Sequence, residues 1–504
     1  MVNALSQIKH VVVVMMENRS FDSVLGWLYE QENNQPPYNI PDQKPTTFAG
    51  LAADQHYNTL NGRQVFASHP PTAWPPPNNP NVVPTPDPHE EFDHITYQIF
   101  GTGNPSQSAA ANMSGFLADY ATVTSPPDQI MQSFGPNEAN VINELAKNFA
   151  VCDAWFASCP CQTWPNRGFV HTGSSDGHIN NDDYELYDIR TIFNVLEERG
   201  ISWGVFHDST VVPSLTWGQF LPRLCMHSNR FYKISSFFRH CSNLNNFPLP
   251  TYSFVEPRFM PEPGLFRIDY PEDYHPPHNV CRGEQFLAQI YQAVRSSPYR
   301  DEILLVITYD EHGGCYDHVP PPNDAVAPNP DGVSRDGQFR FDRFGVRVPT
   351  IVISSYVRGG TVFRALPSSA PYDHTSILAT LRDWLGLTGT TSEWAWLKDW
   401  LNIGNTSNVP FLPSPRIAAA PTLGPILTLT EPRTDWPNIE ATCKLDHIDA
   451  NLETPLSDVQ KSLLAIAKRQ ASTEPVASIQ HSTASEVKGL KTYRDAMHYL
   501  HPEL

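Results

Sequence analysis

Short apolar runs that alternate with helical patterns constrain the fold of this chain more than any other feature of its sequence. Several runs rich in β-branched residues end at turn residues, and they span residues 10–16, 201–206, 252–255, 303–309 and 348–354. Continuous apolar runs of this length are typical of strands that are buried on both faces of a mostly parallel sheet. Helical patterns lie between them, for example at residues 283–296 and 375–385. The alternation predicts an α/β fold with a mostly parallel central sheet and helices on both faces.

The chain has 504 residues, of which 40% are hydrophobic, so it can bury a large core around one such sheet. Its 48 prolines indicate long, stiffened loops, and we expect irregular surface excursions at residues 69–87 and 320–338. The character of the sequence changes after about residue 432, where residues 456–469 and 485–500 have the pattern of amphipathic helices. We therefore expect a main domain over residues 1–431 and a C-terminal helical appendage over residues 432–504, which packs on the main domain or closes an interface.

The formal net charge of -19 restricts the partners of the protein. Such a charge repels phosphate backbones, so a nucleic acid is not an expected partner, and it disfavours adsorption to anionic membranes. An acidic phosphoester substrate would need local positive charge, most simply a bound cation. No apolar run reaches the roughly 18 residues that a transmembrane helix needs. We find no secretory signal in the first residues, so we expect either an intracellular protein or one whose leader has been removed.

The eight cysteines are too few for a disulfide scaffold in a chain of this length. Cys159 and Cys161 flank Pro160, and free thiols are the simpler interpretation of this pair. The redox compartment therefore stays open.

Oxygen-bearing side chains follow two of the predicted strands. Glu17 and Asn18 follow the run 10–16, and Asp310 and Glu311 follow the run 303–309. A single strand that ends in an acidic residue usually just enters solvent, but ligand sites of open α/β sheets lie at the carboxyl ends of strands. Three carboxylates at one edge would repel one another unless a cation held them. Oxygen-only ligands favour Ca²⁺, Mg²⁺ or Mn²⁺ over Zn²⁺, although zinc also accepts carboxylates.

A third segment, TWPNR, begins at Thr163. Thr163 is a candidate helix N-cap, because Pro165 suits the first turn of a helix. A helix N-terminus presents free N–H groups and a partial positive charge to a phosphoryl group, so a threonine there has the position that a nucleophile needs. The alternative is a threonine that only caps the helix.

The chain resembles the bacterial and plant phosphoesterase family that contains the non-specific phospholipases C and the Francisella-type acid phosphatase. The motifs that carry the resemblance are ENRSFD at residues 17–22, TWPNR at 163–167, HPPHNV at 275–280, TYDEHGGCYDHVPPP at 308–322, FDRFGVRVPTIVIS at 341–354 and DHTS at 373–376. They follow one another in family order over roughly residues 9–387, most of the chain.

The resemblance implies an alkaline-phosphatase-like α/β fold with one divalent metal ion in the active site. Carried across by motif, the metal ligands would be the side chains of Glu17, Asn18, Asp310 and Glu311 and the hydroxyl oxygen of Thr163.

The resemblance also assigns catalytic residues. Thr163 would be the nucleophile, since members of the phospholipase C type have threonine there and the acid phosphatase type has serine. His275 would contact the phosphoryl oxygens or the leaving group. His89 matches a family histidine in a similar context, although the local spacing differs, and the surroundings of His207 match poorly.

Together these features predict a metal-dependent phosphoester hydrolase of the phospholipase C type, which cleaves phosphodiesters through a covalent phosphothreonine. Its expected partner is a phosphoester substrate, with phospholipids among the candidates. Two alternatives stay open, an acid phosphatase acting on phosphomonoesters and a catalytically silent module that binds metal or lipid. The sequence leaves the substrate head group and the oligomeric state open.

Overall fold

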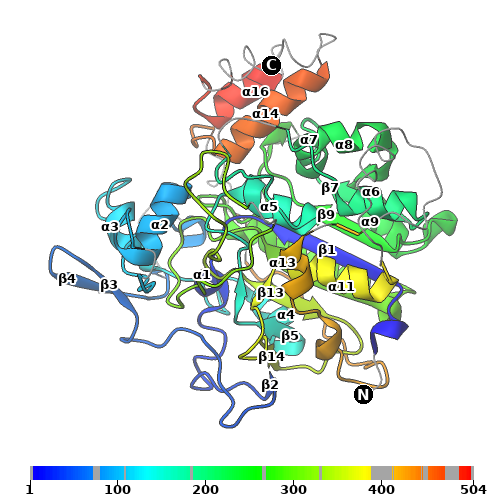
Figure 1. The fold of residues 1–504 in the computed structure, drawn as a ribbon, viewed down its shortest axis with the longest axis horizontal. Coiled ribbons are helices and arrows are strands. Elements are labelled where there is room, and N and C mark those ends of the chain that lie inside the picture. Colours follow the sequence, from blue (N-terminus) through cyan, green and yellow to red (C-terminus); the bar gives the residue numbers. More distant parts are fainter. Residues whose placement is uncertain are drawn as a thin grey trace.

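The computed structural model describes residues 4–71, 80–106, 109–181, 186–263, 268–328, 332–387, 411–412, 414–443, 445, 452–471, 487 and 489–500. The strands of its central sheet are β1 (His10–Met16), β2 (Tyr38–Ile40), β5 (Ala150–Cys152), β7 (Trp203–His207), β8 (Phe231–Lys233), β9 (Tyr252–Glu256), β12 (Ile303–Tyr309), β13 (Thr350–Ile353) and β14 (Thr361–Phe363). In the sheet they are ordered β2-β14-β5-β13-β12-β1-β9-β7-β8 (Figure 1). Adjacent strands run parallel except where β13 pairs with β12 and β5. The predicted α/β class with a mostly parallel sheet is confirmed.

The strands β1 and β12 form the middle of the sheet, paired in parallel with Val13 opposite Val306. Every residue of β12, and every residue of β1 after His10, is buried. Successive side chains on a strand point to opposite faces, so complete burial means that both faces of the sheet are covered. Burial on both faces explains why the apolar runs of the sequence are continuous and do not alternate with polar residues.

Two groups of helices provide the cover. In one group, α10 (Val280–Arg295) packs against α4 (Asn140–Asn148) and α9 (Ile234–Cys241). In the other, α11 (Thr375–Leu385) packs against α5 (Thr163–Thr172) and α13 (Pro415–Ala419), and Figure 1 shows α11 and α13 in front of the sheet. The predicted helix at residues 375–385 is confirmed at both ends, and that at 283–296 begins three residues earlier than predicted.

The C-terminal helices α14 (Asp458–Ala471) and α16 (Tyr493–Leu500) lie side by side at the top of Figure 1. The helix predicted at residues 456–469 is thus present with shifted ends, whereas most of residues 472–488 lies outside the described part of the chain. The apolar side chains of α14, including Leu463 and Leu464, belong to the same hydrophobic core as the central sheet. The C-terminal segment therefore shares the core of the rest of the protein.

A disulfide joins Cys281, in the first turn of α10, to Cys443. No sequence pattern indicated this pair. Cys159 and Cys161 are free and buried, as expected. Of the excursions predicted at residues 69–87 and 320–338, the described parts are irregular apart from a short 3-10 turn at Pro80–Val82, and residues 72–79 and 329–331 lie outside the description.

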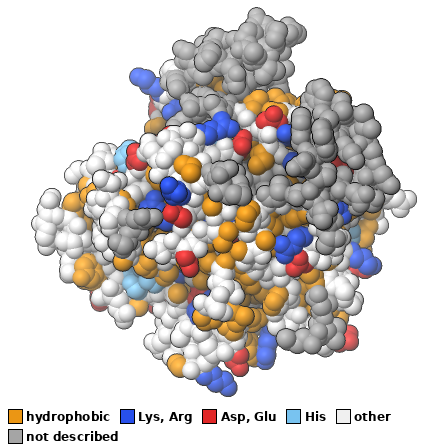
Figure 2. Space-filling view, in the orientation of Figure 1, with side chains coloured by type: hydrophobic (Ala, Val, Ile, Leu, Met, Phe, Trp, Pro, Cys, Tyr) orange, Lys and Arg blue, Asp and Glu red, His pale blue; other side chains and the backbone are white. Residues whose placement is uncertain are grey.

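None of the helices that the structure describes is both long enough and apolar enough to cross a membrane. On the face that Figure 2 shows, acidic and basic side chains are interspersed among apolar ones. The excess of acidic residues is therefore not gathered into one patch on that face.

Candidate active site

The four oxygen-bearing residues predicted at the strand ends lie side by side. The last residues of β1 and β12, Met16 and Tyr309, are opposite each other in the sheet, so the residues that follow them meet at its carboxyl edge. Glu17, Asn18, Asp310 and Glu311 are all buried. The backbone N–H of Asn18 donates to Oδ1 of Asp310 at 3.3 Å and so ties the two strand ends together.

The backbone turns sharply after both strands, at Asn18 and at Gly313. Asn18 has a positive φ of 53°, a left-handed conformation that asparagine tolerates better than most residues. Gly313 also has a positive φ, and a Cβ at this position would collide with the carbonyl oxygen of Asn18. The glycine after the second strand is therefore needed for the close approach of the two loops.

Thr163 lies at the start of α5, but it is not the N-cap that we expected. Gln162 has an extended backbone and occupies the N-cap, so Thr163 is already the first helical residue. Its hydroxyl is therefore not used for capping and donates to Oδ1 of Asn18 at 3.3 Å. The structure thus brings the predicted nucleophile to the predicted metal ligands, together with the N-terminus of a helix.

Arg167, which was not among the predicted site residues, lies one helical turn after Thr163. Its guanidinium is fully buried, with Nη2 at 3.2 Å from Oε1 of Glu17 and Nε donating to Oδ2 of Asp310 at 3.3 Å. The ring of Phe259 lies 5.3 Å from the guanidinium carbon. Residues four apart share one face of a helix, so the motif TWPNR itself contained the signal that Arg167 accompanies Thr163.

The carboxylates of the site fit a divalent cation. Burial, and then the charge of Asp310, raises the pKa of Glu17 well above its usual value. Burial, then Glu90 and Asp310, does the same for the pKa of Glu311. Oε1 of Glu311 is buried without a hydrogen-bond partner among the described residues, and Oε1 of Glu17 contacts only the guanidinium of Arg167 there. Oxygen atoms without partners in a cluster of excess negative charge are the ligands that a hard divalent cation takes.

His275 is also buried and lies beside Glu90. Its Nδ1 is 2.6 Å from the carbonyl oxygen of Pro276, which only accepts, so Nδ1 carries a proton. Nε2 faces Oε2 of Glu90 at 3.7 Å, and Glu90 accepts a hydrogen bond from the amide of Asn18. Burial lowers the pKa of His275, but the carboxylates of Asp87 and Glu90 outweigh it and raise the pKa well above its usual value. The protonated imidazole of His275 therefore contacts Glu90, and Glu90 in turn contacts Asn18, to which Thr163 donates its hydrogen bond.

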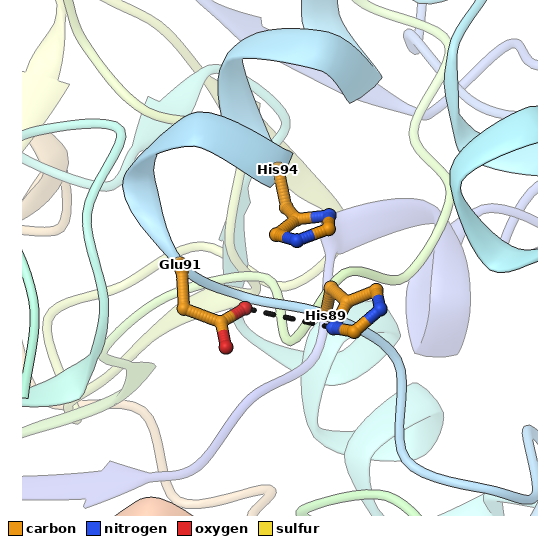
Figure 3. Close-up of side chains that lie close together, drawn as sticks. All are labelled: His89, Glu91 and His94. Atoms are coloured by element: carbon orange, nitrogen blue, oxygen red, sulfur yellow. Dashed lines mark ion pairs between the residues drawn. The ribbon is translucent and has the colours of Figure 1, made fainter. Parts of the chain in front are cut away.

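His89 points elsewhere. Its side chain, about one third exposed, stacks on His94 with ring centroids 3.9 Å apart, and its Nδ1 lies 3.7 Å from Glu91 (Figure 3). The neighbouring residue Glu90 occupies the site instead. His207 ends β7 and lines a cavity of about 230 Å³ with Trp217 and Lys233, and burial lowers its pKa to about 3.

Other motif residues support the site without entering it. Arg347 donates to Asp22 at 2.9 Å and to Asp317 at 3.0 Å, with all three side chains fully buried. This cluster links the motifs that begin at residues 17, 308 and 341. Nε2 of His374 lies 2.6 Å from the carbonyl oxygen of Asp310 and restrains that strand end.

Comparison with known proteins identifies the family. The sequence model of the phosphoesterase family matches residues 8–388. The chain belongs to the phosphoesterase family. Members of this family hydrolyse phosphoric esters, and the protein is a hydrolase of that class. Its match spans all the residues of the site described above.

The plant relatives are more similar in sequence to this chain than the mycobacterial one. Non-specific phospholipase C3 of Arabidopsis thaliana is 34% identical over 449 residues, which cover 86% of this chain and 76% of the relative. Non-specific phospholipase C1 of the same plant is 36% identical over 402 residues, covering 77% and 69%. Phospholipase C B of Mycobacterium tuberculosis (strain ATCC 25618 / H37Rv) is 25% identical over 420 residues, covering 76% and 74%.

Solved structures show more distant similarity. A protein of the alkaline phosphatase superfamily from Vibrio parahaemolyticus is 11% identical with a TM-score of 0.32, covering 50% of this chain and 61% of its own. The lipoteichoic acid synthase LtaP from Listeria monocytogenes is 14% identical with a TM-score of 0.33, covering 72% and 88%. Similarity at this level assigns neither activity nor substrate.

Proposed function

We propose that this phosphoesterase is a metal-dependent enzyme of the phospholipase C type that cleaves phosphodiesters through a covalent phosphothreonine at Thr163. The observation that carries the proposal is the hydroxyl of Thr163 at the N-terminus of α5, hydrogen-bonded to Asn18 among buried carboxylates, of which Glu311 has an Oε1 without a hydrogen-bond partner among the described residues. The names of the plant and mycobacterial relatives support the phospholipase C type.

The residues that would hold the metal are Glu17, Asn18, Asp310 and Glu311, with the hydroxyl oxygen of Thr163. A divalent cation bound there supplies positive charge that favours the alkoxide form of a hydroxyl and offsets the charge of a phosphoryl group. Arg167 contacts Glu17 and Asp310 and holds these two carboxylates in place.

The chain's own groups account for the remaining chemistry. The hydroxyl of Thr163 releases its proton to solvent, and its oxygen attacks phosphorus in line with the leaving alcohol, so that one P–O bond forms as the other breaks. The positive end of the α5 helix dipole stabilises the charge of the phosphoryl oxygens, with the N–H of Thr163 as its donor, because the N–H of Trp164 already donates to Asn181 at 2.9 Å. His275, which carries a proton in this environment, gives it to the leaving alcohol. It then takes a proton from the water that hydrolyses the phosphothreonine and so returns to its starting state.

Substitution of Thr163 tests the nucleophile. Thr163→Ala should lower kcat on bis-p-nitrophenyl phosphate by at least about 10³-fold, because removal of a nucleophile costs several orders of magnitude. Thr163→Ser keeps the hydroxyl and should retain measurable turnover. Mass spectrometry of acid-quenched wild-type protein should find a phosphoryl group on Thr163. Near-wild-type turnover of Thr163→Ala would remove Thr163 from the mechanism.

Substrate and metal preference are tested separately. Rates on bis-p-nitrophenyl phosphate and phosphatidylcholine should exceed the rate on p-nitrophenyl phosphate, and the reverse order would make the protein a phosphomonoesterase. A chelator should abolish turnover, and restoration by Ca²⁺, Mg²⁺, Mn²⁺ or Zn²⁺ identifies the metal. Tight lipid binding without turnover in any metal would indicate a silent binding module.

A further inference from the structure

The C-terminal helices contact the motif that carries His275 through a chain of buried hydrogen bonds. His278 lies three residues after His275, and its Nδ1 is 2.5 Å from Oδ1 of Asp273. Its Nε2 is 2.5 Å from the hydroxyl of Tyr493 in α16. The amide of Gln460 in α14 donates to that hydroxyl at 3.2 Å and to the carbonyl oxygen of Phe259 at 2.8 Å. Two helices from the end of the chain thus meet at one histidine.

The direction of these hydrogen bonds follows from the chemistry of the groups. An ionised carboxylate only accepts, so Nδ1 of His278 donates to Asp273. Nε2 of the neutral ring then accepts from the hydroxyl of Tyr493, and that oxygen accepts from Gln460. Burial lowers the pKa of His278 even though Asp273 lies beside it, in agreement with a neutral ring. Each donor of this chain thus has an acceptor, and the longer contact of 3.3 Å between Nε2 of Gln460 and Nε2 of His278 places the amide against the ring as well.

Asp273 connects this chain to the active site. Its Oδ1 also accepts from the backbone N–H of His275 at 3.1 Å, and its carbonyl oxygen accepts from the backbone N–H of Glu17 at 2.8 Å. One residue therefore restrains the backbone of both His275 and the candidate ligand Glu17.

The turn that Asp273 restrains is strained. Tyr274 lies between Asp273 and His275 with a positive φ of 79°, which is unfavourable for a bulky residue. Such a conformation persists only where its surroundings determine it. Asp273, Tyr493 and Gln460 are almost completely buried, so water does not compete for their hydrogen bonds.

We propose that Tyr493 and Gln460 are positioning residues for phosphoester hydrolysis. They fix His278, and through Asp273 they hold His275 at the phosphoryl group. The C-terminal segment is in this respect a component of the active site. This inference rests on the role of His275 in the proposed function.

A matched pair of tyrosine variants tests the proposal. Tyr493→Phe removes the hydroxyl that contacts His278, whereas Tyr499→Phe removes a buried hydroxyl of the same helix that has no hydrogen-bond partner among the described residues. On bis-p-nitrophenyl phosphate, Tyr493→Phe should lower kcat about 10- to 100-fold with KM within about twofold of wild type, since a small misplacement of a reacting group has an effect of this size. Tyr499→Phe should leave both parameters within about twofold. Equal effects of the two variants would overturn the proposal.

A double-mutant cycle distinguishes positioning from a general loss of folding. In the background of His275→Ala, Tyr493→Phe should have no further effect on kcat, because the group that it positions is already gone. A folding defect would instead lower kcat by the same factor in both backgrounds, and that result would contradict the proposal. The proposed function fails differently: wild-type turnover of His275→Ala would remove His275 from the mechanism. Impaired His275→Ala with unimpaired Tyr493→Phe would overturn only the positioning role.

Discussion

Arg167 contacts the carboxylates of Glu17 and Asp310 with no exposed surface of its own. Removal of one partner from a buried ion pair typically costs about 3–5 kcal/mol, because the other charge stays buried without compensation. We expect Arg167→Met to lower the free energy of unfolding in chelator by about this amount, measured by urea denaturation. A divalent cation should raise the unfolding midpoint more in this variant than in wild type, since it offsets the same carboxylates.

The control for this prediction is Arg63→Met. Arg63 forms an exposed ion pair with Asp128, and water screens such a pair. Its removal should leave the unfolding midpoint unchanged with and without metal. Equal behaviour of the variants of Arg63 and Arg167 would show that Arg167 does not balance the charge of the site.

Glu17, Asn18, Asp310 and Glu311 lie at one edge of the sheet as predicted, because the end of a buried strand is a local feature of the sequence. Their function as metal ligands stays a prediction. Glu90 was not predicted as a site residue, because it does not follow a predicted strand. Its neighbour His89 was chosen instead, and neighbouring residues of an extended segment point in opposite directions. A motif alone does not tell which of His89 and Glu90 faces inward, and only the tertiary fold decides it.

At the scale of elements, Glu284 of α10 links two helices to the active-site turn. Its carboxylate accepts the N–H groups of Val141 and Ile142 in the first turn of α4 and the hydroxyl of Tyr274. Burial raises its pKa to about 7 in spite of these hydrogen bonds. A carboxyl group of the central core therefore titrates near neutral pH.

This pKa predicts a pH dependence of stability. Because the native state holds the proton of Glu284 more tightly than the unfolded state, whose pKa is near 4.5, the associated stability is present below that value and is lost as pH rises to about 7. The loss amounts to at most about 3 kcal/mol. Glu284→Gln does not titrate, so the free energy of unfolding of wild type should fall relative to this variant between pH 5 and pH 7. A difference that is independent of pH would contradict the prediction.

The sequence located the long elements well and the short ones poorly. The run at β1, the run at β12 and the helix α11 carry enough apolar residues in register to fix both ends. The strands β2, β8 and β14 have three residues each, which is too short for a periodic pattern, and none was predicted. They form only because neighbouring strands offer hydrogen bonds, which is a tertiary effect.

At the scale of the whole molecule, the sequence predicted a C-terminal helical segment that packs on the main domain or closes an interface, and its helices do share the core of the main domain. Residues 456–469 do have the pattern of an amphipathic helix, but the pattern does not say which surface the apolar face covers. That face packs into the main core, and Gln460 of the same helix contacts Tyr493 and Phe259. Contacts between residues distant in the chain leave no local signal, so the individual partners of Gln460 and Tyr493 were not predictable.

The disulfide between Cys281 and Cys443 joins residues separated by 162 positions, and it attaches the C-terminal segment three residues after His278. A native disulfide typically contributes about 2–4 kcal/mol by restricting the unfolded chain. Cys443→Ser should therefore lower the free energy of unfolding by about 2–4 kcal/mol in non-reducing buffer, measured by urea denaturation. Dithiothreitol should bring wild type to the level of the variant, whereas Cys225→Ser, which changes an exposed free thiol, should match wild type in both buffers.

If the segment also holds His278 in place, Cys443→Ser should lower kcat in the same direction as Tyr493→Phe, because both changes loosen the contact between α16 and the turn at His275. Full stability and turnover of Cys443→Ser would show that the packing of the C-terminal helices alone is sufficient.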